Sequence, residues 1–183
     1  MKKRYFALAL ALLLTFSLTA LAEERYSTIE VEGAPEILME TKYENAEAGF
    51  VCWYAPEYFA VLWDTLADPQ GQWMLHSLAE GGAPAYLTAE WPEKEQITGA
   101  AYLANRPLMD NLPTDSLSEV SVTQNDQGVV FSYRSGYDGE SYYEYFAAQK
   151  GAKELLLRLC CPLNDLSNNG VRLTQAVFSF DLF

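Results

Sequence analysis

The sequence predicts an α+β domain in which an antiparallel sheet is flanked by helices and closed by a C-terminal helix. Alternating apolar runs, separated by turn residues, recur along the chain and indicate strands. One central stretch and one C-terminal stretch instead place apolar side chains at helical spacing. The strands come in groups before and after the central helix, an order typical of α+β domains rather than of parallel α/β folds.

Residues 1–22 have the three parts of a secretory signal peptide. A basic start (Lys2 to Arg4) precedes an apolar run over 5–18, and the small residues Ala20 and Ala22 follow as a cleavage signal. A membrane anchor is the alternative, but the run is short for a span of about 20 residues. We expect cleavage after Ala22, which leaves one α+β domain over 23–183 that is secreted or extracytoplasmic and not membrane-bound.

The charge balance is acidic. The chain has 12 Lys and Arg against 25 Asp and Glu, and loss of residues 1–22 would remove three basic and no acidic side chains. The remaining net charge of −16 repels phosphate backbones and anionic membrane surfaces, so nucleic-acid binding is disfavoured. Plain solubility outside the cell explains the same composition.

The first half of the chain is predicted to be mostly strand. The densest apolar run, Gly49 to Tyr54, reads as a buried strand, and the polar segment 44–49 makes it one arm of a hairpin. After Pro56, the proline and Glu57 favour a short helical turn over 56–63. Strands are expected over 25–32, 37–43, 50–54, 72–78 and 85–91.

The second half begins with a helix over 93–106 that Pro107 is expected to end. A four-strand antiparallel meander should follow, because the apolar runs are joined by short Asn-, Asp- and Gly-rich turns. Pro162 ends it, and an amphipathic helix over 165–182 closes the domain. The meander strands are expected over 117–123, 129–133, 142–149 and 152–161.

A strand that begins Gly49-Phe50, continues through Trp53-Tyr54 and leaves by Pro56 and Phe59 resembles the PsbP-like fold, named for an extrinsic subunit of photosystem II. The resemblance extends over nearly all of residues 23–183 through the order of elements. Here Ala55 separates Tyr54 from Pro56, whereas members of the family commonly place the proline directly after the aromatic residue. Many small exported bacterial proteins of unknown role resemble the same family. The resemblance implies a binding or accessory role and carries over no photosystem-binding or metal-binding residue.

No catalytic or metal-binding motif appears. His76 is the one histidine, and no Gly-x-Ser-x-Gly stands in the chain. Neither zinc-ligand spacing nor a calcium loop nor a Gly-rich phosphate loop is present. We therefore assign no catalytic residue, no metal site and no cofactor.

Three cysteines leave two alternatives. Export would permit a disulfide from Cys52 to Cys160 or Cys161, and an odd count leaves at least one thiol unpaired. Adjacent cysteines on a strand point to opposite faces, so at most one of the pair can face Cys52. Alternatively, all three are buried thiols that pack as small hydrophobes.

A tyrosine-rich stretch is the main candidate for binding. On a strand, Tyr143 and Tyr145 share one face, while Tyr142, Glu144 and Phe146 share the other, with Tyr137 at the preceding turn. Tyrosines beside carboxylates suit sugars, peptides or cationic groups. The sequence therefore nominates Tyr137, Tyr143, Tyr145 and Glu144 as ligand-binding residues, with cross-strand packing as the alternative role.

These observations favour a secreted, non-enzymatic binding or accessory domain that engages an extracellular protein or a cell-wall component. A second hypothesis is a cell-wall glycan hydrolase that uses paired carboxylates, which needs two carboxyl groups about 5 to 10 Å apart. A third is a structural or assembly domain linked through an unpaired cysteine.

Overall fold

The computed structural model describes residues 23–46, 48–63, 73–78, 84–90 and 97–183. Within these ranges, strands predominate, and two α-helices, α3 (Gly99–Met109) and α4 (Val171–Phe178), accompany them. The strands are β1 (Glu24–Val31), β2 (Ala34–Asn45), β3 (Phe50–Tyr54), β4 (Phe59–Trp63), β5 (Trp73–Ser77), β6 (Tyr86–Glu90), β7 (Ser121–Gln124), β8 (Val130–Tyr137), β9 (Ser141–Lys150), β10 (Lys153–Pro162) and β11 (Asp181–Leu182).

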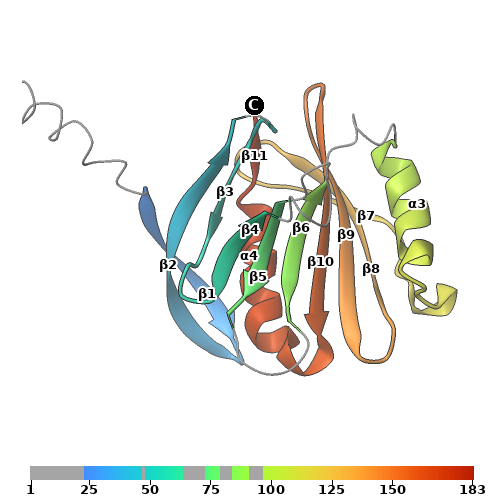
Figure 1. Cartoon of the computed structure of the whole chain (residues 1–183), viewed down its shortest axis with the longest axis horizontal. Coiled ribbons are helices and arrows are strands. Elements are labelled where there is room, and N and C mark those ends of the chain that lie inside the picture. Colours follow the sequence, from blue (N-terminus) through green and yellow to red (C-terminus); the bar gives the residue numbers. More distant parts are fainter. Residues whose placement is uncertain (1–22, 47, 64–72, 79–83, 91–96) are drawn as a thin grey trace, which may run out of the picture.

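The strands form two antiparallel sheets. One has the order β1-β2-β3-β11, and the other has the order β4-β5-β6-β10-β9-β8-β7 (Figure 1). Helix α3 packs on one face of the larger sheet, over β8, β9 and β10, while α4 contacts β3 and β1 of the smaller sheet. The α+β class and the antiparallel pairing are thus confirmed, with the strands divided between two sheets.

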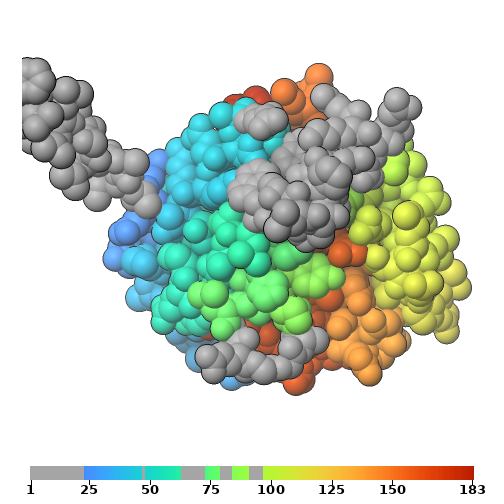
Figure 2. All heavy atoms as spheres, viewed as in Figure 1, coloured from blue at the N-terminus to red at the C-terminus, as the bar shows by residue number. Residues whose placement is uncertain are grey.

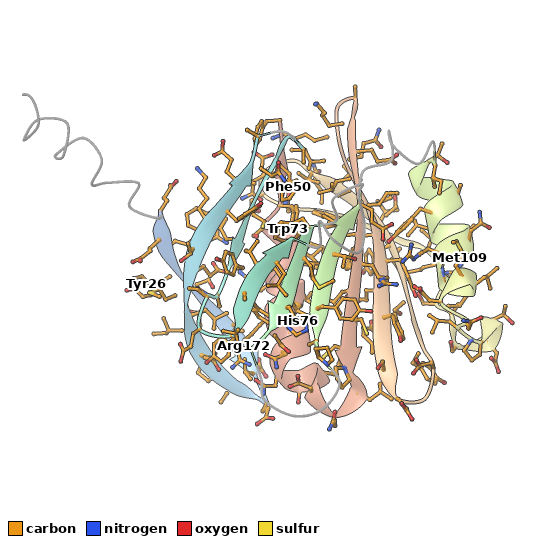
Figure 3. All side chains as sticks on the ribbon, in the orientation of Figure 1. Tyr26, Phe50, Trp73, His76, Met109 and Arg172 are labelled. Atoms are coloured by element: carbon orange, nitrogen blue, oxygen red, sulfur yellow. The ribbon has the colours of Figure 1, made fainter. Side chains whose placement is uncertain are left out.

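The main core lies between the sheets and includes α4. Phe50 of β3 makes an edge contact with Trp73 of β5, with ring centroids 5.4 Å apart, and stacks on Phe180 at 5.2 Å (Figure 3). All three side chains are fully buried. Phe50 belongs to the apolar run that the sequence places at the centre of the fold, and burial of such rings contributes about 2 kcal/mol or more each.

Gly49 makes this arrangement compatible with the chain terminus. Its φ is +71°, and a Cβ there would lie 2.7 Å from the carbonyl oxygen of Phe183. Glycine therefore permits both the left-handed turn into β3 and the close approach of the C-terminal strand β11, which pairs with β3.

Most predicted strands are present, but three helical predictions are wrong in part. The segment after Pro56 makes a short turn and then β4, not a helical turn, because Phe59 enters the core and β4 pairs with β5. The closing helix ends at Phe178 instead of 182, and residues 181–182 form β11. The segment before α4, Leu163 to Gly170, is 3₁₀ and π-helical.

The central helix also differs from its prediction. Thr98 caps it by accepting a hydrogen bond from the Ala101 N–H, so it begins at Gly99, and it continues past Pro107 to Met109. Proline lacks the N–H that would bond to Leu103, and Arg134 Nη1 donates to that free Leu103 oxygen at 3.5 Å. A tertiary donor thus compensates for the proline. Residues 91–96, where the helix was expected to begin, and the predicted signal peptide lie outside the described residues. The same holds for 68–71 and 80–82, whose Pro and Gly residues predict turns between strands.

Candidate functional site

The two faces of β9 have different environments, as its alternation predicts. Tyr143 and Tyr145 project toward α3, and their rings stack with centroids 6.4 Å apart. Tyr145 is 0% exposed. A ligand cannot contact Tyr145 while α3 is in place, so the face formed by Tyr143 and Tyr145 packs a helix and is not an open binding surface.

Tyr145 belongs to a polar cluster that anchors α3. Its hydroxyl donates to Asp110 Oδ2 at 2.9 Å, and Arg158 Nη1 donates to Asp110 Oδ1 at 2.8 Å. Arg106 lies between Asp110 and Glu90, at 3.4 Å from each carboxylate. Burial and the nearby Asp110 raise the pKa of Tyr145, so its hydroxyl stays a donor. The four charges alternate in sign and hold the helix to β6, β9 and β10.

Tyr143 is more accessible but is also engaged. Its hydroxyl donates to Asp138 Oδ2 at 3.0 Å, while Asp138 Oδ1 accepts from the N–H groups of Glu140 and Ser141. These bonds, led by those from Ser141 and Glu140, lower the pKa of Asp138. Tyr143 therefore supports the tip of the β8–β9 hairpin. Strands β9 and β10 reach the surface between β6 and α3 (Figure 2).

The other face of β9 borders a groove along α4. The Tyr142 hydroxyl donates to Glu144 Oε1 at 2.9 Å, and both side chains line a hollow of about 400 Å³ together with Phe178 and Gln175. A neighbouring hollow of about 480 Å³ is also lined by Gln175 and Phe178, and the two adjoining hollows are together called the α4 groove. Tyr137, which is exposed, lies opposite Tyr142 in the β8–β9 register.

The walls of the α4 groove come from both sheets. Strand β1 contributes Arg25 to Ser27 and Ile29, and the β7–β8 turn contributes 123–127. Tyr26 projects outward from β1 (Figure 3). Thr174, Gln175 and Phe178 of α4 form the floor, and the Phe178 ring also packs edge-on against the buried rings of Phe131 and Phe146. The site thus brings together residues from both ends of the chain.

Some polar side chains of the α4 groove are already hydrogen-bonded within the protein, and others are not. Asn125 is occupied, because its amide nitrogen donates to the carbonyls of Phe178 (3.1 Å) and Phe180 (2.7 Å) at the end of α4. The amides of Gln124, Gln127 and Gln175 make no side-chain hydrogen bond to any described residue, and so they are available to a ligand. Burial raises the pKa of Tyr142 to about 12 and also raises the pKa of Glu144.

The carboxylates of the groove are not paired. Glu144 lies opposite Ser135, whereas Asp126 is in the turn beyond Val130. Ser135 is five positions after Val130 on strand β8, so at about 3.3 Å per residue Asp126 and Glu144 lie about 16 Å or more apart along the strand. This separation exceeds the spacing of about 5 to 10 Å that glycoside hydrolysis uses.

In the structure the three cysteines are buried free thiols, which is the arrangement that the second alternative expects. Cys52 and Cys161 pack in the main core, and Cys160 faces the opposite side of β10, next to Tyr143 and Tyr86. Burial raises the pKa of Cys52 strongly and that of Cys161 to about 12. None offers an exposed sulfur for linkage to another chain.

Other candidate chemistry is limited. His76 is half-buried, and its Nδ1 lies 2.9 Å from the Ser77 carbonyl. Among the described residues, no cluster of three His, Cys, Asp or Glu side chains is arranged to hold a metal ion. No helix in the described ranges is long and apolar enough to cross a membrane.

The sequence placed Glu144, Tyr143 and Tyr145 on the correct faces of their strand, but the four nominated residues do not form one site. Tyr137 and Glu144 belong to the α4-groove side, and Tyr143 and Tyr145 to the α3 side. The sequence reasoning missed Gln175 and Phe178. Their only local signal is a polar and an aromatic position on the outer side of an amphipathic helix.

No protein-family model and no curated protein matches the chain. By structure, it is similar to the solution structure of cyanobacterial PsbP (CyanoP) from Synechocystis sp. PCC 6803. The TM-score is 0.54, with 13% sequence identity over 79% of this chain and 92% of the cyanobacterial one. At this identity the similarity concerns the fold alone. The chain therefore has a PsbP-like fold, as the Gly49–Phe59 segment and the order of elements predict.

Proposed function

We propose that this protein is an exported, non-enzymatic binding domain that holds a saccharide of the cell wall in the α4 groove. The observation that carries the proposal is the groove itself, two adjoining surface hollows in which glutamine amides lie beside tyrosine and phenylalanine rings. Its two hollows, of about 480 and 400 Å³, fall within the range of ligand sites.

The chemistry of the lining favours a sugar. Aromatic rings such as Tyr142 and Phe178 offer apolar faces to the C–H surfaces of a pyranose, and a tyrosine adds a polar edge. The Gln175 amide both donates and accepts, and the Glu144 carboxylate accepts, which matches the many hydroxyls of a saccharide. A neutral sugar is also indifferent to the acidic charge of the chain, which would repel an anionic ligand.

Binding without hydrolysis fits the same residues. The wide separation of Asp126 and Glu144 supports a role in which Glu144 accepts hydrogen bonds. The predicted signal peptide over 1–22 supports an extracytoplasmic location. If this location is right, mass spectrometry of the exported protein will find a chain that begins at Glu23.

The test is a titration of the purified chain with an N-acetylglucosamine tetramer, together with co-sedimentation on purified peptidoglycan. Tyr142→Ala removes a ring and the hydroxyl bonded to Glu144, and Gln175→Ala removes a free amide. Each should weaken binding roughly tenfold, equivalent to about 1.4 kcal/mol.

The matched control is Tyr143→Ala, which removes the same type of side chain from the next position of β9, on the α3 side. Its affinity should remain within about twofold of that of the unmodified chain. Absence of binding to both probes, or an equal loss in Tyr143→Ala and Tyr142→Ala, would contradict the proposed site.

A further inference from the structure

A third hollow, of about 490 Å³, is separate from the α4 groove and lies on the opposite face of the larger sheet, between α3 and strands β8 and β9. Val130, Ser132 and Arg134 alternate along β8 on this face, opposite Gln149, Ala147 and Tyr145 of β9. Leu103 and Ala104 of α3 form one wall, and Val120, which is 51% exposed, stands on the other side. We call it the α3 groove.

The position of α3 leaves this space open. At its first residue the helix is in close contact with the sheet, since a Cβ on Gly99 would lie 2.5 Å from the Ala147 Cβ. The Gly99 N–H also donates to Glu154 Oε1 at 3.2 Å. Farther along, the helix lines the groove with Leu103 and with the small side chains of Ala100 and Ala104. The α3 wall of the groove is therefore apolar, the sheet side includes the polar side chains of Ser132 and Gln149, and Glu154 makes one end acidic.

Arg134 supplies a cation to the lining. Its Nη2 donates to the Ser118 carbonyl at 2.9 Å, and its Nη1 donates to the Leu103 carbonyl that Pro107 leaves free. Both partners are neutral, and Arg134 forms an ion pair with no described carboxylate. Its Nε is also buried without a hydrogen-bond partner in the described part of the chain. No described carboxylate therefore pairs with the guanidinium, although 25 acidic side chains are present in the protein.

Charge and shape together indicate the ligand class. An uncompensated guanidinium binds carboxylates through charge-assisted hydrogen bonds. Of its five N–H groups, two donate to the Ser118 and Leu103 carbonyls, and three donate to no described residue. Next to it, Leu103, Val120 and Val130 offer an apolar surface to a hydrocarbon chain. We propose that the α3 groove binds an alkyl carboxylate, with the carboxylate at Arg134 and the chain directed along α3 toward Ala100.

The polarity of the groove fixes this orientation. Glu154 would repel a carboxylate at the far end, so an alkyl carboxylate should enter only with its head at Arg134. A long-chain amine would have to place its cation at Glu154. The Glu154 carboxylate already accepts a hydrogen bond from the N-terminus of α3, so the groove should bind an amine more weakly than a carboxylate. The proposal is independent of saccharide binding, because the two grooves lie on opposite faces of the sheet.

The test is calorimetric titration of the purified chain with decanoate, methyl decanoate and decyltrimethylammonium. Decanoate should bind at least tenfold more tightly than either of the others. Arg134→Gln should abolish this preference for the carboxylate, and Arg134→Lys should restore part of it, because a lysine keeps the charge but not the planar fork. Equal affinity for decanoate and its methyl ester, or no decanoate binding at millimolar concentration, would overturn the proposal.

Arg134 also braces α3, so a second variant tests the site without that contact. Ala104→Phe fills the groove from an exposed helical position and should reduce decanoate affinity at least tenfold with an unchanged melting temperature. Its affinity for the N-acetylglucosamine tetramer should be unchanged. Undiminished decanoate binding by Ala104→Phe would show that the alkyl chain lies elsewhere and would refute the assignment.

Discussion

The attachment of α3 to the larger sheet can be tested through the ion pair between Asp110 and Arg158. Their side chains are only 17% and 16% exposed, and the Asp110 carboxylate accepts from both Arg158 and Tyr145. Removal of one partner from a buried pair costs about 3–5 kcal/mol. Because both groups retain some contact with water, we expect Asp110→Asn to lower the free energy of unfolding by about 3 kcal/mol.

A double-mutant cycle separates the pair from its surroundings. Arg158→Met should cost about 2 kcal/mol, since Asp110 keeps its bond from Tyr145, and methionine retains the apolar stem. If the pair is coupled, the double variant should cost only about 3 kcal/mol, a coupling energy of about 2 kcal/mol. Arg106, which is 3.4 Å from Asp110, remains in every variant and limits the loss.

The measurement is urea unfolding followed by tyrosine and tryptophan fluorescence, with the slope checked for two-state behaviour. Asp115→Asn is the control, since Asp115 is an exposed carboxylate close in sequence, and it should change stability by less than about 0.5 kcal/mol. A coupling energy below about 0.5 kcal/mol, or equal costs for Asp110→Asn and Asp115→Asn, would refute the anchoring role.

Three further predictions concern other buried groups. Burial raises the folded-state pKa of Glu144 above its unfolded value, so stability should fall as pH rises from about 4.5 through the folded pKa. Glu144→Gln should remove this part of the pH dependence, measured as the free energy of unfolding from urea titrations at several pH values. The same pH profile in Glu144→Gln and in the unmodified chain would contradict this prediction. Arg172 donates to the Glu36 carboxylate through Nε and Nη2, and its guanidinium lies 3.8 Å from the centre of the Tyr58 ring. Arg172→Lys should therefore lower the melting temperature through a loss of about 1–3 kcal/mol, and an unchanged melting temperature would argue against the contact. The three buried thiols should not react with a disulfide reagent in the folded protein. After denaturation without reductant, the reagent should modify three thiols per chain, and a smaller number would indicate a disulfide.

Local patterns were sufficient to predict much of the fold. The strands of the meander follow from alternating side chains and turn residues, and the buried run that includes Phe50 lies in the main core as expected. Errors arose where a distant residue changed the local outcome. Pro107 does not end α3, because Arg134 from another element supplies a donor to Leu103. The last strand exists because Asp181 and Leu182 pair with β3, a contact that no local pattern specifies.

The candidate site was less predictable than the fold. Alternation separated Tyr143 and Tyr145 from Glu144, but nothing in the sequence says which face α3 covers. The contacts that join α3 to that face, such as the Asp110–Arg158 pair and the packing of Leu103 on Ala147, are between residues far apart in the chain. The α4 groove likewise exists only once β1 and the β7–β8 turn lie on either side of α4, so long-range topology creates it.

The most direct test of the central claim is amide chemical-shift mapping of the isotopically labelled chain during titration with the N-acetylglucosamine tetramer. Binding in the α4 groove predicts saturable shifts in 25–29, 123–127, 142–144 and 174–178, the segments that line it. Amides of α3 (Gly99–Met109) should not respond. Shifts confined to α3, or no saturable shifts at millimolar tetramer, would contradict the account.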